Sequence, residues 1–283
     1  MNTEIKDTEI RVIGGEPQPP TGGGRWRRWW WLAAALVLAV VAGIVLRPRH
    51  NAPSAEAADT VTTPTVDDGW LMAGVDTTQA CVHHTTAGVD TTLLHIYLPL
   101  MSTAELAVGA LDTTDPDILM AVQAADLRRD NGRIVGAFVL AGEPLSWGLS
   151  KRGYCAIIDG QLTLGVADNS PLFEQATEQG GDFFRQYPAV DRGQAVENNP
   201  ENSARRRALC TLEGRTCLIL SDDRMTMNAF AQTLETLGVS DAIFLVGGNA
   251  YGWVRTDDGT LQHLGSPPPN HKKFTNYILF RRR

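Results

Sequence analysis

The sequence predicts an α+β fold: a mixed α/β sheet with a local βαβ crossover, in a single exported domain behind an N-terminal transmembrane helix. Three patterns support this prediction. An uncharged run near the N-terminus is long enough to cross a bilayer. Apolar runs joined by two-residue turns indicate β-hairpins. Late in the chain, an apolar run, a segment of helical periodicity and a second apolar run follow one another, which is typical of a crossover.

The uncharged run covers residues 29–46 and reads WWWLAAALVLAVVAGIVL. As a helix it would be about 27 Å long, close to the hydrocarbon core of a bilayer. Five basic residues precede it and two follow closely, which predicts a cytoplasmic segment at 1–28 and a periplasmic or other extracytoplasmic C-terminal part. A cleaved signal peptide is the alternative, with Ala55-Glu56-Ala57 as a poor cleavage site.

Residues 47–67 are rich in Ala, Thr and Pro and lack Phe, Trp and Tyr, so they are predicted to form a flexible linker. Residues 68–283 then form one domain. Residues 51–283 hold 18 basic and 28 acidic residues, a net charge of −10. Such an acidic domain argues against a nucleic-acid partner. The expected contact is with the inner membrane through one helix, and the composition indicates no oligomeric state.

The first half of the domain is predicted to consist of strands, at 93–100, 132–140, 154–158 and 161–166. Asp159-Gly160 joins the last two as a hairpin turn. Residues 118–125 are apolar enough for a buried strand, but a helix opening at Asp115-Pro116 fits the same residues.

Two cysteines face each other in a predicted hairpin. Apolar runs at 208–212 and 215–220 flank Glu213-Gly214, and counting outward from this turn sets Cys210 opposite Cys217. Opposed Cβ atoms lie about 4.5–5.5 Å apart, wider than the ~3.8 Å of a disulfide. A disulfide and two buried free thiols therefore both remain compatible with the pattern.

The predicted crossover consists of a strand at 217–220, a helix between Thr226 and Gly238, and a strand at 242–246. Its two strands would be locally parallel. The loops at their carboxyl ends, 221–223 and 247–249, are where α/β sheets tend to bind ligands. The two glycines of the second loop permit close approach of a ligand, or simply a tight turn.

A polar stretch, 197–207, leads into the first strand of the cysteine hairpin. Side chains alternate along a strand, so Arg206 lies on one face and Arg205 and Arg207 lie on the other. An arginine fork suits an anionic or hydroxyl-rich substrate, and a surface cluster of ion pairs is the alternative.

The runs GYCAIIDGQLTLGVADNSPLFEQATEQGGDFFRQYP, VENNPENSARRRALC and LGVSDAIFLVGGNAYGW resemble the phosphodiester glycosidase family. This family includes the lysosomal enzyme that uncovers mannose 6-phosphate, and the chain is most similar to a branch found in Bacteroides-type bacteria. The resemblance covers roughly residue 121 to the C-terminus. It implies that Arg206 is the family arginine, that 247–249 is the glycine loop and that Asn276 is the asparagine of the closing strand.

Two departures from the family pattern concern the site itself. The family aspartate before the glycines is Val246 here, and the family Asn-Gly-Gly element is Ala124-Ala125-Asp126, which would place Asp126 in the site. Loss of a carboxylate removes an acid/base or a ligand for a sugar hydroxyl. The alternative to an enzyme is therefore a non-catalytic envelope glycan-binding module of the same fold.

The resemblance implies an envelope-anchored hydrolase of sugar-phosphate phosphodiesters or related glycosidic bonds, acting without a cofactor on a carbohydrate or sugar-phosphate ligand. Arg206 is expected to bind the phosphate or the leaving-group oxygen, and Asp126 and Glu197 are the candidate acid/base pair. The expected substrate-binding residues are Asn198, Asn202, Asp222, Gly247, Gly248, Asn249 and Asn276.

The topology of the hairpin and crossover predicts that Arg206, Asp222 and Gly248 share one edge of the sheet. No metal site is expected. His83 and His84 point to different sides of a strand, and no further ligand stands at a suitable spacing on either face.

Overall fold

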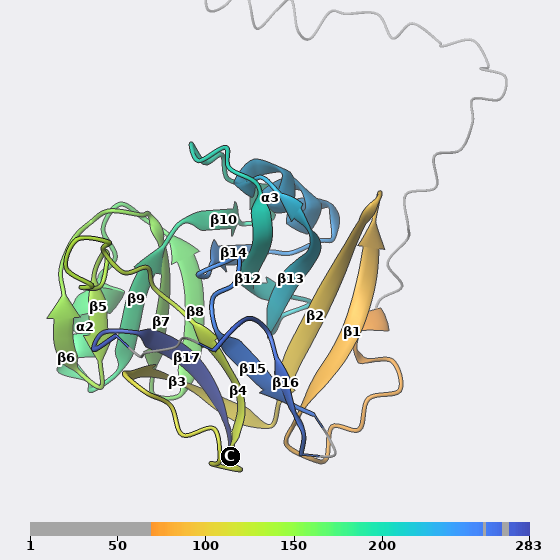
Figure 1. Ribbon diagram of the computed structural model, residues 1–283, viewed down its shortest axis with the longest axis horizontal. Helices are drawn as coiled ribbons and strands as arrows, with labels where there is room; N and C mark the ends of the chain where they lie inside the picture. The colour runs from red at the N-terminus through yellow and green to blue at the C-terminus, as the bar shows by residue number, and fades with distance from the viewer. Residues whose placement is uncertain (1–68, 257–258, 268–271) are drawn as a thin grey trace, which may run out of the picture. The chain divides into compact units, whose positions relative to one another are not determined.

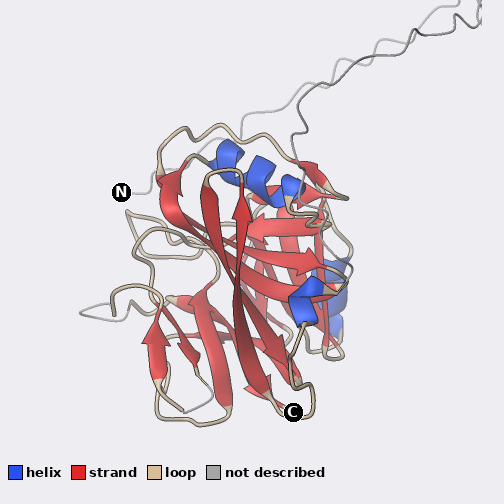
Figure 2. Ribbon diagram, turned by 90° about the vertical axis from the view of Figure 1, so that its right-hand side faces the viewer, coloured by secondary structure: helices blue, strands red, loops and turns tan. Residues whose placement is uncertain are grey.

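The computed structural model describes residues 69–256, 259–267 and 272–283 of the 283-residue chain. The predicted cytoplasmic segment, transmembrane helix and linker lie outside these residues. In the described part of the chain, no helix has both the length and the apolar character needed to cross a bilayer. This part consists mainly of strands, arranged in three antiparallel sheets (Figure 1, Figure 2).

The first sheet holds the predicted cysteine hairpin at its centre. Its spatial order is β1 (Cys81–Val89), β2 (Thr92–Leu100), β13 (Arg215–Met225), β12 (Ala204–Leu212), β14 (Asp241–Phe244), β10 (Pro188–Asp191) and β11 (Gln194–Ala195). Glu213 and Gly214 both have positive φ, as a type I′ two-residue hairpin turn requires. Cys210 pairs with Cys217, which confirms the predicted register, and both buried thiols are free.

The second sheet orders its strands as β16 (Leu261–His263), β15 (Gly252–Arg255), β4 (Ile118–Gln123), β17 (Asn276–Arg282) and β3 (Ser102–Val108). The third orders them as β6 (Glu143–Ser146), β5 (Phe138–Leu140), β9 (Asp182–Gln186), β7 (Gly153–Ile158) and β8 (Gln161–Val166). The open question at 118–125 is thus resolved as a buried strand. The predicted strand at 132–140 is shorter, because Gly132 and Gly136 adopt positive φ before β5 begins.

Helices are few among the described residues: the 3₁₀-helix η1 (Trp70–Met72) and the α-helices α2 (Leu172–Glu178) and α3 (Met227–Thr236). Helix α3 forms as predicted. The Thr226 hydroxyl accepts a hydrogen bond from the Ala229 amide at 3.1 Å, and Gly238 follows the helix with a φ of 90°. The helix buries Phe230 and Leu234 against one face of the first sheet.

The predicted α+β class, with a mixed α/β sheet, is wrong. Strands β13 and β14 do point the same way on either side of α3, but β12 lies between them and pairs antiparallel with both. The connection therefore crosses over one intervening strand, and no pair in the three sheets of the described part is parallel. The apolar runs and the periodic segment between them predict where the strands and the helix form. Which strands pair with one another depends on residues far away in the sequence.

The main core lies where the three sheets meet. The face of the first sheet opposite α3 contributes Leu209, Leu218 and Ile243. They form one buried cluster with Met120 and Ile278 of the second sheet and with Phe138, Cys155 and Phe184 of the third. Arg207 lies on this same face, two residues before Leu209, so its charge enters the domain beside the core.

Candidate functional site

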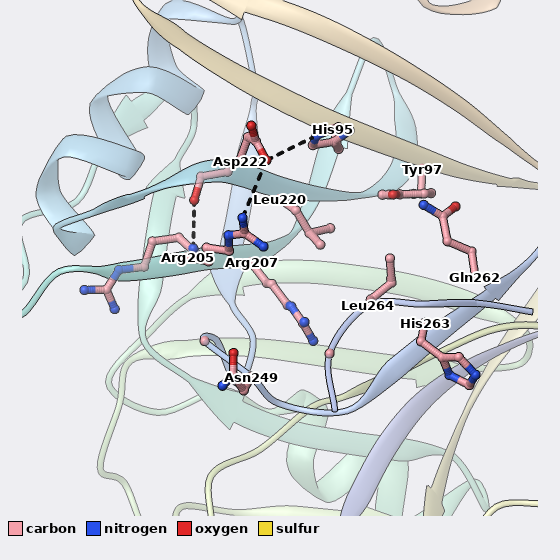
Figure 3. A pocket seen from close by; sticks show the side chains of 14 residues that line it. His95, Tyr97, Arg205, Arg207, Leu220, Asp222, Asn249, Gln262, His263 and Leu264 are labelled. Atoms are coloured by element: carbon pink, nitrogen blue, oxygen red, sulfur yellow. Dashed lines mark hydrogen bonds and ion pairs between the residues drawn. The ribbon is translucent and has the colours of Figure 1, made fainter. Parts of the chain in front are cut away.

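Two pockets lie near the loop that follows β14. The first, here called the arginine pocket, has a volume of about 230 Å³ and is lined by β2, β12, β13, Gly248, Asn249 and residues 262–265 (Figure 3). The second, here called the Asp126 pocket, has about 270 Å³ and is lined by Gln123, Ala125, Asp126, Leu127, Val246, Lys272, Thr275 and Asn276.

Backbone hydrogen bonds hold this loop beside the start of β12. The Gly248 amide donates to the Arg205 carbonyl, and the Leu245 amide donates to the Arg207 carbonyl, both at 2.9 Å. A Cβ atom on Gly247 would come within 3.0 Å of the Arg205 carbonyl oxygen, so glycine suits this close approach. Arg206, Asp222 and Gly248 line one pocket, which confirms their predicted proximity.

The three consecutive arginines lie where the pairing of β12 with β13 is interrupted by a bulge in β13. Pairing with β13 shifts between Arg205, opposite Arg224, and Arg207, opposite Leu220. Arg206 donates from Nε to the Met225 carbonyl at 2.9 Å and from a terminal nitrogen to the Asn202 carbonyl. Its guanidinium thus ties the segment before β12 to the end of β13.

Arg207 enters the arginine pocket. Figure 3 shows its side chain extending between Asn249 and Leu264, while Arg205 turns toward Asp222. Arg207 is only 4% exposed, and its Nη1 donates to the Ala250 carbonyl at 2.7 Å. Burial lowers the pKa of this guanidinium to about 10, so it keeps its positive charge at neutral pH. Sequence alternation indicated its face, but the family motif directed attention to Arg206.

Asp222 is half-exposed at the rim of the arginine pocket. Its Oδ1 lies 3.8 Å from His95 Nε2 and 3.9 Å from a terminal nitrogen of Arg205. His95 stacks with His84, which in turn stacks on Tyr97 with ring centroids 4.4 Å apart. Burial, and then the charges of neighbouring histidines, lower the pKa of His84.

A buried lysine holds the carboxylate of the second pocket. Lys151 Nζ donates to Asp126 Oδ2 and, at 2.8 Å, to Gln186 Oε1, and only 6% of its side chain is exposed. Desolvation lowers the pKa of Lys151, an effect that the Asp126 charge opposes. Arg185 donates to the backbone carbonyls of Lys151, Ala167 and Asp168, which fixes the loop that carries the lysine. No sequence pattern marked Lys151, Arg185 or Gln186.

Asn276 closes the Asp126 pocket from the last strand. Its Oδ1 accepts a hydrogen bond from the Ala125 amide at 2.7 Å, and its Nδ2 donates to the Ala125 carbonyl at 3.1 Å. The side chain is 1% exposed, so these two bonds fix the backbone next to Asp126.

The other expected site residues lie elsewhere. Glu197 is exposed and lines neither pocket. The buried Asn198 side chain donates to the carbonyls of Pro188 and Val196, and the Asn202 carbonyl accepts from Arg206. Asp126 and Glu197 therefore share no pocket described here. Within the described ranges, no group of three or more His, Cys, Asp and Glu side chains is arranged to hold a metal ion.

No known family model and no curated protein matches the sequence. The chain does match solved structures. The catalytic domain of zebrafish N-acetylglucosamine-1-phosphodiester α-N-acetylglucosaminidase, auto-inhibited by its pro-peptide, aligns over 72% of this chain and 83% of its own, at 14% identity and a TM-score of 0.51. A hypothetical protein from Synechocystis aligns over 71% of this chain and 62% of its own, also at 14% identity and a TM-score of 0.51. At this identity the likeness shows a shared fold.

Proposed function

We propose that the domain is a phosphodiester glycosidase-like hydrolase whose reaction site is the Asp126 pocket. The observation that carries this proposal is a convergence. The three segments that the family resemblance singled out around residues 126, 246 and 276 line one pocket, although they are far apart in the sequence. The fold shared with a zebrafish phosphodiester glycosidase supports the same class of reaction.

The lining of the Asp126 pocket suits a single sugar ring. Asp126, Gln123 and Thr275 offer hydrogen-bonding groups for hydroxyls, and Leu127 and Val246 offer an apolar surface for the C–H face of the ring. The hydrogen bond from Lys151 holds the Asp126 carboxylate in one orientation. A fixed carboxylate can position the attacking water against the substrate.

A single carboxylate suffices for this reaction. Water attacks the anomeric carbon, the bond from that carbon to the phosphate oxygen breaks, and Asp126 takes the proton of the water. The products are the free sugar and a phosphate monoester. Because a phosphate monoester leaves as a weakly basic anion, its departure requires no general acid. Glu197, which lies outside the pocket, is then not needed as a partner.

The test is hydrolysis of a panel of sugar 1-phosphodiesters by the full-length chain and its Asp126→Asn variant. We expect wild type to release free sugar, and the variant to lose about 100- to 10,000-fold in kcat. Asp130→Asn is the matched control, since Asp130 is exposed in the same loop. An Asp126→Asn variant as active as wild type would refute the role of Asp126.

One observation favours the alternative, a glycan-binding module without turnover. Val246 lines the Asp126 pocket at the position where the family resemblance places an aspartate. This alternative predicts saturable calorimetric binding of a sugar 1-phosphodiester that is never hydrolysed. Turnover at ordinary enzyme rates, about 1 per second or more, would exclude it.

We further propose that the domain works outside the inner membrane, anchored by residues 29–46. The uncharged run and its basic N-terminal flank support this location. A C-terminal alkaline phosphatase fusion should be active, and a C-terminal green fluorescent protein fusion should be dark. The opposite pattern would refute the proposed topology.

A further inference from the structure

The arginine pocket contains a buried cation without a buried counter-charge. In the described parts of the chain, no carboxylate lies within ion-pairing distance of Arg207, and its one recorded hydrogen bond goes to the neutral Ala250 carbonyl. A charge that is 4% exposed is costly to leave unpaired. A guanidinium has five N–H donors, and Arg207, which lines the pocket, uses one of them for the Ala250 carbonyl.

The rest of the pocket lining complements an oxyanion. Arg205 adds a second positive charge at the rim, where it lies 3.9 Å from the Asp222 carboxylate, and His95 lies 3.8 Å from the same oxygen. Gln262, which lines the pocket near Tyr97, brings a side-chain amide to the same space (Figure 3). A planar guanidinium can bind two phosphate oxygens at once. The hydrogen bond from Arg207 Nη1 to the Ala250 carbonyl leaves the other guanidinium nitrogens available for such binding.

We propose that the arginine pocket is a phosphate-binding site in which Arg207 holds the phosphate oxygens. Arg206 has the structural task of joining the segment before β12 to β13, and Arg205 adds charge at the rim. The proposal goes beyond the hydrolase function, because binding of phosphate here requires no turnover. The pocket volume of about 230 Å³ also leaves room for a group attached to the phosphate.

Calorimetric titration of the full-length chain with inorganic phosphate, at constant ionic strength, tests the proposal. We expect saturable binding by wild type, a loss of at least about tenfold in affinity for Arg207→Gln, and a smaller loss for Arg207→Lys, which keeps the charge without the fork. Arg215→Gln is the matched control: it removes one charge at the exposed turn end of the same hairpin and should bind as wild type.

Arg205→Glu protects the test against misfolding of the Arg207 variants. Its side chain is 66% exposed, so the variant should fold normally, and reversing the charge at the rim should weaken phosphate binding severalfold. The proposal is overturned if wild type shows no saturable binding, if Arg207→Gln binds as wild type, or if Arg215→Gln, at the turn end of the hairpin, weakens binding equally.

Hydrolysis by the same variants identifies the source of the phosphate. A raised KM with unchanged kcat in Arg207→Gln would assign it to the phosphodiester substrate. An unchanged KM together with lost phosphate binding would assign it to a separate phosphorylated ligand. Both results support the pocket. Failure of the hydrolase proposal is seen independently, as absent turnover in a wild-type chain that still binds inorganic phosphate.

Discussion

The Asp126 pocket and the arginine pocket differ in the hydrogen-bond partners of their buried cations. Lys151 beside the first has two oxygen acceptors, one of them the Asp126 carboxylate. Arg207 in the second donates to a single neutral carbonyl. A cation with an internal partner orients that partner, whereas a cation without one favours an anion from outside. Burial of a positive charge therefore does not by itself decide whether the side chain orients a partner within the protein or binds an external anion.

The same distinction separates the buried arginines. Arg185 and Arg206 donate several hydrogen bonds to backbone carbonyls and so connect segments of the domain. Arg207 has the same side chain and similar burial, but it makes only one such bond, to the Ala250 carbonyl. Removal of the connecting arginines should therefore reduce stability, and removal of Arg207 should reduce binding.

The largest effect is expected for Arg185→Met. Three backbone carbonyls lose a charged donor, and such bonds contribute about 1.5–3 kcal/mol each, so the free energy of unfolding should fall by at least about 3 kcal/mol. Chemical denaturation followed by tryptophan fluorescence measures it. Arg152→Met, at a side chain that is 58% exposed, should change stability by less than about 0.5 kcal/mol. Equal losses in the two variants would contradict the connecting role.

A smaller effect distinguishes Arg206→Gln from Arg207→Gln. The first should cost about 1–3 kcal/mol, since the Met225 and Asn202 carbonyls lose a charged donor. The second should cost less than about 1 kcal/mol in phosphate-free buffer, because removing an unpaired buried charge offsets the lost bond to Ala250. Denaturation of both variants side by side tests the contrast, and a larger loss for Arg207→Gln would break it.

The smallest effect concerns pH. His84 stacks with His95 and Tyr97, two residues that line the arginine pocket, and burial, followed by the charges of His95 and His83, lowers its pKa in the folded chain. Between that lowered pKa and 6.5 the unfolded chain binds more protons, so stability should decline as pH falls through 6.5. Unfolding measured from about pH 7.5 to 5.5 should show this slope in wild type and a flatter one in His84→Gln. An unchanged slope in the variant would assign the effect elsewhere.

Features set by neighbouring residues were predictable from the sequence. The register of Cys210 and Cys217 follows from a two-residue turn, and α3 follows from its cap and apolar period. The arrangement of strands was not predictable in this way. Strand β12 separates β13 from β14 because of pairings that involve residues about 30 positions apart, which no local apolar pattern encodes.

The candidate site shows the same limit. Asp126 and Asn276 were found through the family resemblance, but Lys151 stands in a loop without periodicity, and only folding brings it to Asp126. Arg207 did carry a signal. An arginine that alternates with Leu209 on the buried face of a strand needs a polar partner or a ligand.

The hydrogen bonds between Asn276 and Ala125 join segments 151 positions apart. Bringing such distant segments together costs loop entropy before the contacts form, so we expect this closure to occur late in folding. Until β17 has been synthesised, the Ala125 backbone lacks its Asn276 partner, and the Asp126 pocket is incomplete. Ligand binding in the Asp126 pocket would thus mark the moment when the second sheet has received its last strand.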